Sequence, residues 1–256
     1  MIANKVSLLL LSVTLLFVTG CNNQAQKNEI TIAAASDVYL AFTEIGELFK
    51  EETSINVTFS FGSTGQLSKQ IEEGAPFDLF AAANDSFIRD LSEKKSIISD
   101  YQKIYAIGRL GVYYPHLETM DFNVNQQLLD TTIKTIAIAN PEHAPYGKAA
   151  KEALESMGIW DQVKEKVVYA ENIRQAYQFV ETGNADVGII ARALIEEQTV
   201  DKFLLLDSQT HQPITQTFGI PAQSKNKAFS KQFVDFVMSD TGQEILIKYG
   251  FEIPQE

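Results

Sequence analysis

Four short segments place backbone N–H groups where they could bind an anion. In each one a strand-like stretch leads into a helical pattern through small residues or a residue that favours a helix start. These segments are residues 33–37, 61–65, 144–147 and 171–173. The first N–H groups of a helix have no partner within the helix, and the helix dipole favours negative charge there. The set predicts one site of hydrogen-bond donors that faces an anion.

Each segment alone also has a simpler interpretation. Ser36, Thr64 and Asn172 are good N-cap residues, and most capped helices bind nothing. Gly62 and Gly65 fit neither a phosphate loop nor a dinucleotide fingerprint. The anion hypothesis therefore depends on finding all four junctions in one chain.

No residue pattern indicates catalysis or a metal cation. There is no Ser/His/Asp set and no close carboxylate pair, and His116, His143 and His211 lack metal-ligand spacing. Cys21 is the only cysteine, so thiol catalysis and cysteine clusters are excluded. The net charge of −12 disfavours nucleic acid as a partner. We expect a binding protein that is no enzyme and has no cofactor.

The elements that must position these junctions alternate between strand and helix. Strands are expected at residues 30–35, 57–61, 78–82, 134–139, 167–169 and 186–190, and helices at residues 40–51, 66–73, 87–94, 148–157 and 173–182. Gly74, Gly158 and Gly183 follow three of the helices, where a left-handed residue ends a helix. This alternation predicts an α/β protein with parallel-rich sheets and helices on both faces.

Two extended stretches, residues 108–114 and 213–222, flank a central block that has its own strand–helix alternation. They are expected to cross between two lobes as a hinge. The first lobe would comprise residues 30–108 plus 217–256, and the second residues 109–216.

The N-terminal segment has the features of an export signal. Lys5 precedes an apolar core at residues 6–18, and small residues lead directly to Cys21. This arrangement resembles a bacterial lipoprotein signal, with residues 1–20 removed, Cys21 lipidated and residues 21–29 forming a tether. The alternative is an ordinary signal peptide. In either case the protein would be extracytoplasmic, and lipidation would anchor it to the cell membrane.

Taken together and in order, five segments resemble the bacterial molybdate-binding proteins of ABC importers. They are AAASD at 33–37, FGSTGQLSKQIEEGAPFDLFAAA at 61–83, NPEHAPYGKAAKEAL at 140–154, ENIRQAYQFVETGNADVGII at 171–190 and KYGFEIP at 248–254. The resemblance implies a two-lobed periplasmic-binding-protein-like fold of type II that closes on a tetrahedral oxyanion. It also implies delivery to a membrane permease by a protein that we expect to be a monomer.

The resemblance also implies which atoms would contact the oxyanion. Hydroxyl groups would come from Ser36 and from Thr64 or its neighbour Ser63, and backbone N–H groups from Tyr146 and Ile173. The family has a further tyrosine hydroxyl at the position of Ala191, which leaves that contact in doubt. Molybdate is a dianion with no proton to donate, so a site of donors alone can satisfy it.

Other ligands and other functions stay open at this point. Tungstate has nearly the size and charge of molybdate, whereas sulfate is smaller and would need further closure. A sensory lipoprotein that only presents its ligand is a second alternative. A two-lobed transferase or hydrolase would need catalytic residues, and a transcription regulator would need a DNA-binding segment in place of the export signal.

Overall fold

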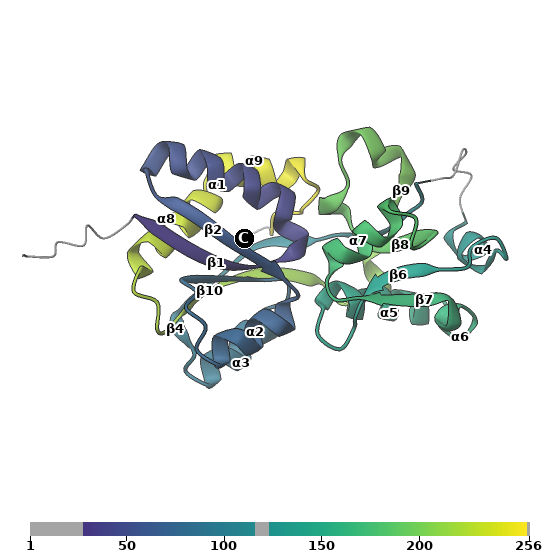
Figure 1. Cartoon of the computed structure of the whole chain (residues 1–256), viewed down its shortest axis with the longest axis horizontal. Helices are drawn as coiled ribbons and strands as arrows, with labels where there is room; N and C mark the ends of the chain where they lie inside the picture. Colours follow the sequence, from purple (N-terminus) through teal and green to yellow (C-terminus); the bar gives the residue numbers. More distant parts are fainter. Residues whose placement is uncertain (1–27, 116–122, 255–256) are drawn as a thin grey trace, which may run out of the picture.

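The structure, a computed structural model, describes residues 28–115 and 123–254. It consists of two lobes side by side, each built around a five-stranded sheet (Figure 1). The predicted signal segment and Cys21 lie outside the described residues. None of the described helices is both long enough and apolar enough to cross a membrane.

The first sheet has the strand order β2-β1-β3-β10-β4. Strand β1 is parallel to its two neighbours, β2 and β3. Strand β10 is antiparallel to its two neighbours, β3 and β4. The strands are β1 (Glu29–Ala35), β2 (Asn56–Gly62), β3 (Leu79–Ala82), β4 (Ile97–Gly108) and β10 (Ile214–Pro221).

Helices cover both faces of the first sheet, with α1, α8 and α9 on one side and α2 and α3 on the other (Figure 1). Successive side chains of β1 point to opposite faces of the sheet, so both faces are apolar. Ile30 and Ile32 pack on the side of α1, α8 and α9, and Ala33 packs on the side of α2 and α3. The helices are α1 (Tyr39–Thr53), α2 (Thr64–Glu72), α3 (Asp85–Glu93), α8 (Lys227–Val237) and α9 (Asp240–Lys248).

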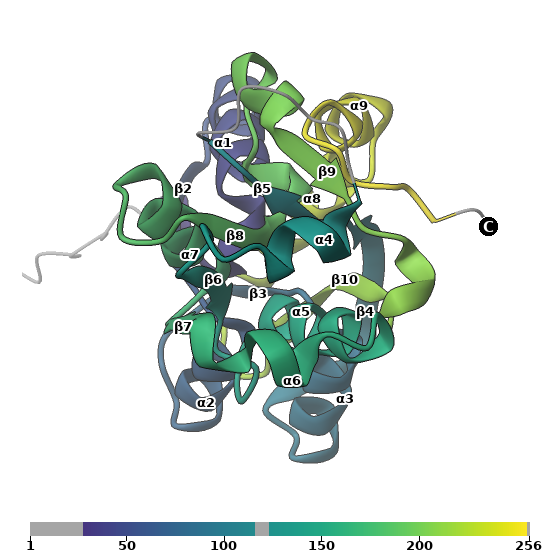
Figure 2. The ribbon, with the colours of Figure 1, turned by 90° about the vertical axis from the view of Figure 1, so that its right-hand side faces the viewer.

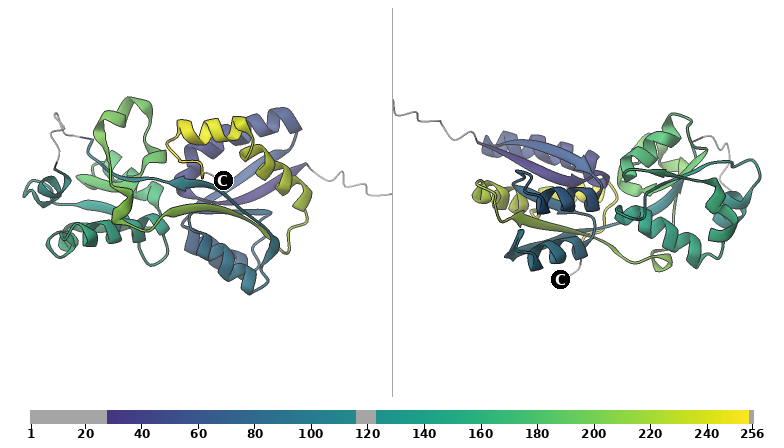
Figure 3. Two further views of the ribbon diagram at one scale, coloured as in Figure 1. Left: turned by 180° about the vertical axis from the view of Figure 1, so that it is seen from behind. Right: turned by 60° about the horizontal axis from the view of Figure 1, so that its bottom comes forward.

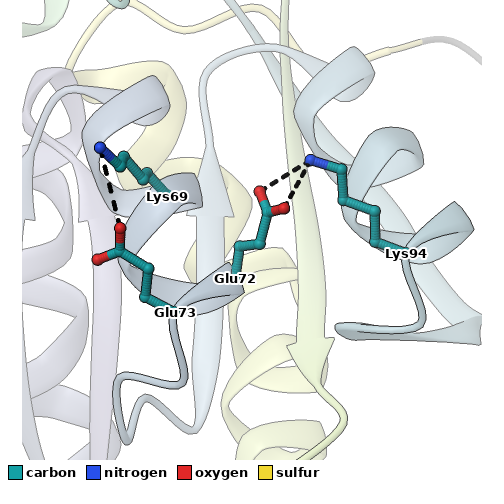
Figure 4. Close-up of polar contacts among 4 residues, drawn as sticks. All are labelled: Lys69, Glu72, Glu73 and Lys94. Carbon is teal, nitrogen blue, oxygen red and sulfur yellow. Dashed lines mark hydrogen bonds and ion pairs between the residues drawn. The ribbon is translucent and has the colours of Figure 1, made fainter.

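The outer surface of α2 carries ion pairs that are exposed to solvent (Figure 4). Lys69 Nζ lies 3.8 Å from Glu73 Oε1, and Lys94 Nζ, just after α3, lies 2.8 Å from Glu72 Oε2. Exposed pairs of this kind contribute about 0–1 kcal/mol each. These charges therefore tie the ends of α2 and α3 together only weakly, and the apolar contacts beneath them hold the helices on the sheet.

The second sheet has the order β7-β6-β8-β5-β9, and this lobe faces the viewer in Figure 2. All four residues of β6 are buried, since α5 and α7 both pack against that strand. The strands are β5 (Leu110–Tyr113), β6 (Ile136–Ala139), β7 (Val167–Ala170), β8 (Val187–Ala191) and β9 (Phe203–Leu205). The helices are α4 (Val124–Leu129), α5 (Pro145–Ser156), α6 (Trp160–Val163) and α7 (Ile173–Glu181). The described residues of the two lobes also form five 3₁₀ helices, η1 (Ser36–Val38), η2 (Lys164–Lys166), η3 (Arg192–Leu194), η4 (Glu197–Lys202) and η5 (Ser208–Thr210).

The chain passes between the lobes along two neighbouring extended paths, as the view from behind shows (Figure 3). One path runs from β4 into β5, and the other enters β10, where Ile214 pairs with Gly108. The C-terminal segment contacts the chain where β4 leads into β5. Ile107 and Glu252 form a backbone bridge, and Arg109 forms an ion pair with Glu252.

The predicted two-lobed α/β fold is confirmed. The sheets are mixed, because the two stretches predicted as crossings, β5 and β10, join them antiparallel. Gly74, Gly158 and Gly183 end their helices with φ of +92°, +71° and +72°, as predicted from their positions. The long strand β4 was not predicted from the sequence.

Candidate functional site

A small interlobe cavity lies where the carboxyl ends of β1, β2, β3, β6 and β7 meet. It is small, which suits an ion of a few atoms rather than a larger metabolite. All four predicted junctions meet here. The lining residues are Ala35, Ser36, Asp37, Gly62, Ser63, Thr64, Ala83, Ala144, Pro145, Tyr146 and Ile173.

Ser36 connects the two lobes at this cavity. Its hydroxyl donates to Asn172 Oδ1 at 3.0 Å and accepts the Arg174 N–H at 3.3 Å. It makes no cap bond to its own helical turn. The simpler interpretation of Ser36 as an N-cap of the following helix therefore does not hold, because its hydroxyl bonds to residues at the start of α7 in the other lobe.

Ser63 and Thr64, both predicted to contact the anion, lie at the start of α2. Ser63, rather than Thr64, is the N-cap of α2, accepting the Gln66 N–H at 3.4 Å. The Ser63 hydroxyl also lies 2.8 Å from His143 Nδ1 of the second lobe. Thr64 is the first residue of the helix, and its Oγ1 accepts the buried Ala83 N–H at 3.1 Å. Its own O–H donates to no other residue that the structure describes, so it is available as a donor.

The second lobe contributes helix N-termini to the cavity. No side chain caps α5, which begins with Pro145 at its first position, so the N–H groups of its first turn, including that of Tyr146, are left for another acceptor. In α7 the predicted cap is correct, because Asn172 Oδ1 accepts the Gln175 N–H at 3.0 Å. Ile173 is the first residue of that helix.

Contacts across the cavity hold the lobes in a closed arrangement. The Gly65 N–H donates to the His143 carbonyl at 2.9 Å, and Gln66 Nε2 donates to Glu171 Oε1 at 3.1 Å. At the rim the Arg174 guanidinium lies 3.4 Å from the centre of the Tyr39 ring. A ligand in the cavity would therefore be enclosed by both lobes.

Asp37 is a lining residue that the sequence analysis missed. It is fully buried, and burial raises the pKa of its carboxyl to about 7. No lysine, arginine or histidine is among the described residues that line the cavity. Among the described lining residues the site therefore contains one carboxylic acid besides its donors, and the only sequence signal for Asp37 was its place directly after Ser36.

Ala191 lies at the end of β8, paired with Leu110. It is completely buried and belongs to the core of the second lobe rather than to the cavity lining. Among the described residues no group of three or more His, Cys, Asp or Glu side chains could hold a metal ion.

A two-lobed fold that closes on a small cavity lined with donors defines a class of ligand-binding proteins. The chain matches the family model described as bacterial extracellular solute-binding protein over residues 30–252. It therefore belongs to the family of bacterial extracellular solute-binding proteins. This is a family of binding proteins rather than enzymes.

Individual relatives cover nearly the whole chain. The chain is 32% identical to the molybdate-binding protein ModA of Rhodobacter capsulatus over 93% of each protein. It is 31% identical to the putative ABC transporter substrate-binding lipoprotein YvgL of Bacillus subtilis, over 92% of this chain and 93% of that one. Among solved structures, the periplasmic molybdate-binding protein of Azotobacter vinelandii matches with a TM-score of 0.84 at 26% identity, over 88% of this chain and all of that one.

Proposed function

We propose that this protein captures molybdate or tungstate between its lobes and delivers it to the permease of an ABC importer. The observation that carries the proposal is the cavity itself, which is small, closed by both lobes and lined with hydrogen-bond donors. Two of the relatives above are named for molybdate binding, and a third for ABC transport. We expect one ion per chain and a monomeric protein.

Five groups would donate hydrogen bonds to the oxyanion. The hydroxyls of Ser36, Ser63 and Thr64 would act from the first lobe, and the backbone N–H groups of Tyr146 and Ile173 from the second. Each bond to a charged acceptor contributes about 1.5–3 kcal/mol, which offsets the cost of taking the dianion out of water. They bind oxygen atoms, so no protein atom would coordinate the molybdenum itself.

Ser36 and Ser63 would each change a hydrogen bond on binding. The Ser36 proton would turn from Asn172 Oδ1 to the anion, while its oxygen still accepts the Arg174 N–H. If the ring of His143 donates through Nδ1, the Ser63 oxygen accepts that bond and its own proton is directed to the anion.

Another tetrahedral oxyanion, such as sulfate, is the alternative ligand. The sulfate-binding protein SubI of Mycobacterium tuberculosis matches with a TM-score of 0.73. Because the sequence identity is only 15%, this likeness shows a shared fold and not a shared ligand. A lipoprotein that presents its ligand to a sensor would use the same cavity. Transport and sensing can be distinguished by measuring molybdate uptake through an ABC permease. If this protein with bound molybdate stimulates the permease, its function is transport.

Calorimetry of the purified protein against molybdate, tungstate, sulfate, phosphate and chromate tests the ligand directly. Molybdate and tungstate should bind one per chain with Kd at or below about 1 μM, close to −8 kcal/mol. Sulfate and phosphate should bind far more weakly. Sulfate binding as tight as that of molybdate would reject the assignment.

We infer that residues 30–108 plus 217–256 move as one lobe against residues 109–216. The two paths through β4–β5 and β10 would act as the hinge. Dyes placed by cysteine substitution at the exposed positions Glu47 and Glu155, in a Cys21→Ser background, would report the motion. Molybdate should bring the dyes closer together, and an unchanged distance would argue against closure.

We also propose that Cys21 carries lipid and anchors the protein outside the cytoplasmic membrane. Support comes from the apolar segment that ends in Cys21 and from a relative whose name includes the word lipoprotein. Cys21→Ser should release the protein from the membrane fraction or leave its signal uncleaved. Normal processing with unchanged membrane association would contradict lipidation.

A further inference from the structure

A cluster of four buried polar side chains lies at the interlobe cavity. Asp37 and Tyr105 of the first lobe and Gln216 of the strand β10 are completely buried, and Tyr146 of the second lobe is 2% exposed. Gln216 Nε2 donates to Asp37 Oδ2 at 2.7 Å, and the Tyr105 hydroxyl donates to Gln216 Oε1 at 3.2 Å. Asp37 Oδ1 has no hydrogen bond of normal geometry to any described residue.

The second lobe completes this cluster when the two lobes meet. The Tyr146 hydroxyl reaches across to Gly108, where even a Cβ atom would lie 2.1 Å from it. Its interaction with the Asp37 carboxyl lowers the pKa of Asp37 and so opposes part of the effect of burial, although Tyr146 Oη and Asp37 Oδ1 each lack a partner of standard hydrogen-bond geometry among the described residues. Closure therefore adds a neutral phenol to the surroundings of Asp37 and no positive charge.

No basic side chain on the elements around Asp37 neutralises its carboxyl. The turn that contains Asp37 packs against α1, α7 and η3. Arg174 of α7 lies over the Tyr39 ring, and Arg192 of η3 donates to the Ile195 carbonyl. The remaining neighbours are Tyr105 of β4, Gln216 of β10 and Tyr146 of α5. Burial and the nearby Asp37 raise the pKa of both tyrosines well above the ordinary value, so they stay neutral.

Asp78 shows what a buried aspartate of this lobe looks like when its role is structural. Its Oδ1 accepts the Ser224 hydroxyl at 2.8 Å, and its Oδ2 accepts the Thr31 N–H at 3.0 Å. Both oxygen atoms are satisfied within the fold. In Asp37 the Oδ2 atom accepts the Gln216 amide, whereas Oδ1 has no partner of standard geometry among the described residues, and the residue lines the cavity.

A dianion in the cavity would stand beside this buried carboxyl. Two neighbouring negative charges disfavour each other's ionised form, and a buried charge without a partner is costly. Molybdate offers no proton of its own at neutral pH. The carboxyl is therefore the group that can lose its charge, by taking a proton from solvent.

We propose that Asp37 is a proton-binding site that fills as the anion is captured, so that one proton enters the closed cavity with each dianion. The carboxylate takes up a proton from solvent to become a carboxyl group, and it returns the proton when the lobes open. This inference rests on the proposed function, since it needs a dianion in the cavity.

The sign of the pH dependence follows from this exchange. The bound state holds one proton more than the free state wherever the pH lies between the pKa of Asp37 in the free protein and its higher pKa in the complex. Within that range a rise of one pH unit should weaken molybdate binding up to tenfold. Above and below the range the affinity should be level.

Calorimetry in buffers of different ionisation enthalpy counts the protons directly. Wild-type protein titrated with molybdate near pH 7, close to the pKa of about 7 that burial gives this carboxyl, should take up a substantial fraction of one proton per ion. Asp37→Asn should take up none, should bind with an affinity that does not change with pH, and should bind more tightly than the wild type at high pH. Glu44→Gln, which changes a carboxylate that pairs with Lys248 away from the cavity, should behave as the wild type.

Three outcomes would overturn the proposal, and they are distinguishable. Molybdate binding by the wild type without proton uptake, or equal uptake by Asp37→Asn, would refute proton binding at Asp37 and leave the proposed function intact. No molybdate binding at any pH would refute both. If Asp37→Asn fails to fold, the ¹³C shift of the Asp37 carboxyl decides, because it should titrate at higher pH with molybdate than without it.

Discussion

The two walls of the cavity use different chemistry. In the proposed site the first lobe would present side-chain hydroxyls from Ser36, Ser63 and Thr64, whereas the second would present main-chain N–H groups at Tyr146 and Ile173, all of them residues that line the cavity. A hydroxyl can be deleted by one substitution, but an N–H group disappears only if its helix moves or proline replaces the residue. The comparison implies that single substitutions on the first wall change affinity directly, and that the second wall acts through its position.

Ser36→Ala should have the largest effect on affinity among the wall variants. It removes a predicted donor to the anion, worth about 1.5–3 kcal/mol, which is about 10- to 150-fold in Kd. Calorimetry with molybdate measures this, with Ser208→Ala on the exposed turn η5 as the matched control. A fall in thermal stability with unchanged affinity would show that Ser36 serves only its bonds to Asn172 and Arg174.

Gly65→Ala should separate closure from folding. In the closed structure a Cβ at Gly65 would lie 2.7 Å from the His143 carbonyl oxygen of the opposite wall. We expect overpacking of about 1–3 kcal/mol to oppose closure and weaken molybdate binding.

The same substitution should favour α2 in the open protein, because alanine stabilises a helix by up to about 1 kcal/mol over glycine. Differential scanning calorimetry without ligand should therefore show a melting temperature at or above that of the wild type. Gln70→Ala, on the exposed side of the same helix, is the control and should leave affinity unchanged. Unchanged affinity in Gly65→Ala would show that the lobes need not approach this closely.

Arg174→Gln should have the smallest effect. It removes the cation–π contact with Tyr39 at the rim but leaves the Arg174 N–H that bonds Ser36. Such contacts contribute about 0.5–1 kcal/mol at exposed sites, so Kd should rise about twofold to fivefold, mainly through faster dissociation. Stopped-flow measurement of the release rate checks this, and a loss above tenfold would mean that the guanidinium contributes directly to ion binding.

Local sequence signals predicted much of the fold and all four junctions of the cavity. The helix periodicity and terminal glycines marked α2, α5 and α7, and short apolar stretches marked β1, β2 and β6. The long strand β4 escaped, because its sequence mixes charged and apolar residues without regular alternation. Its pairing with β10 depends on a contact between distant parts of the chain.

Neighbouring residues and long-range contacts limited the prediction of the site. Ser63 and Thr64 are both suitable caps, and only the backbone conformation shows that Ser63 is the N-cap. The bond from Ser36 to Asn172 spans 136 residues, so no local pattern could indicate it. The burial of Asp37 could not be predicted locally either, because it depends on strands and a helix from both lobes.

The position of the bound ion is the most direct test of this account. Crystals grown with tungstate, measured at the tungsten absorption edge, should show one anomalous peak per chain in the interlobe cavity. Its oxygen atoms should lie within hydrogen-bond distance of Ser36 Oγ on one wall and the Tyr146 N–H on the other. A tungstate bound outside this cavity, or contacting one lobe alone in a closed protein, would contradict the account.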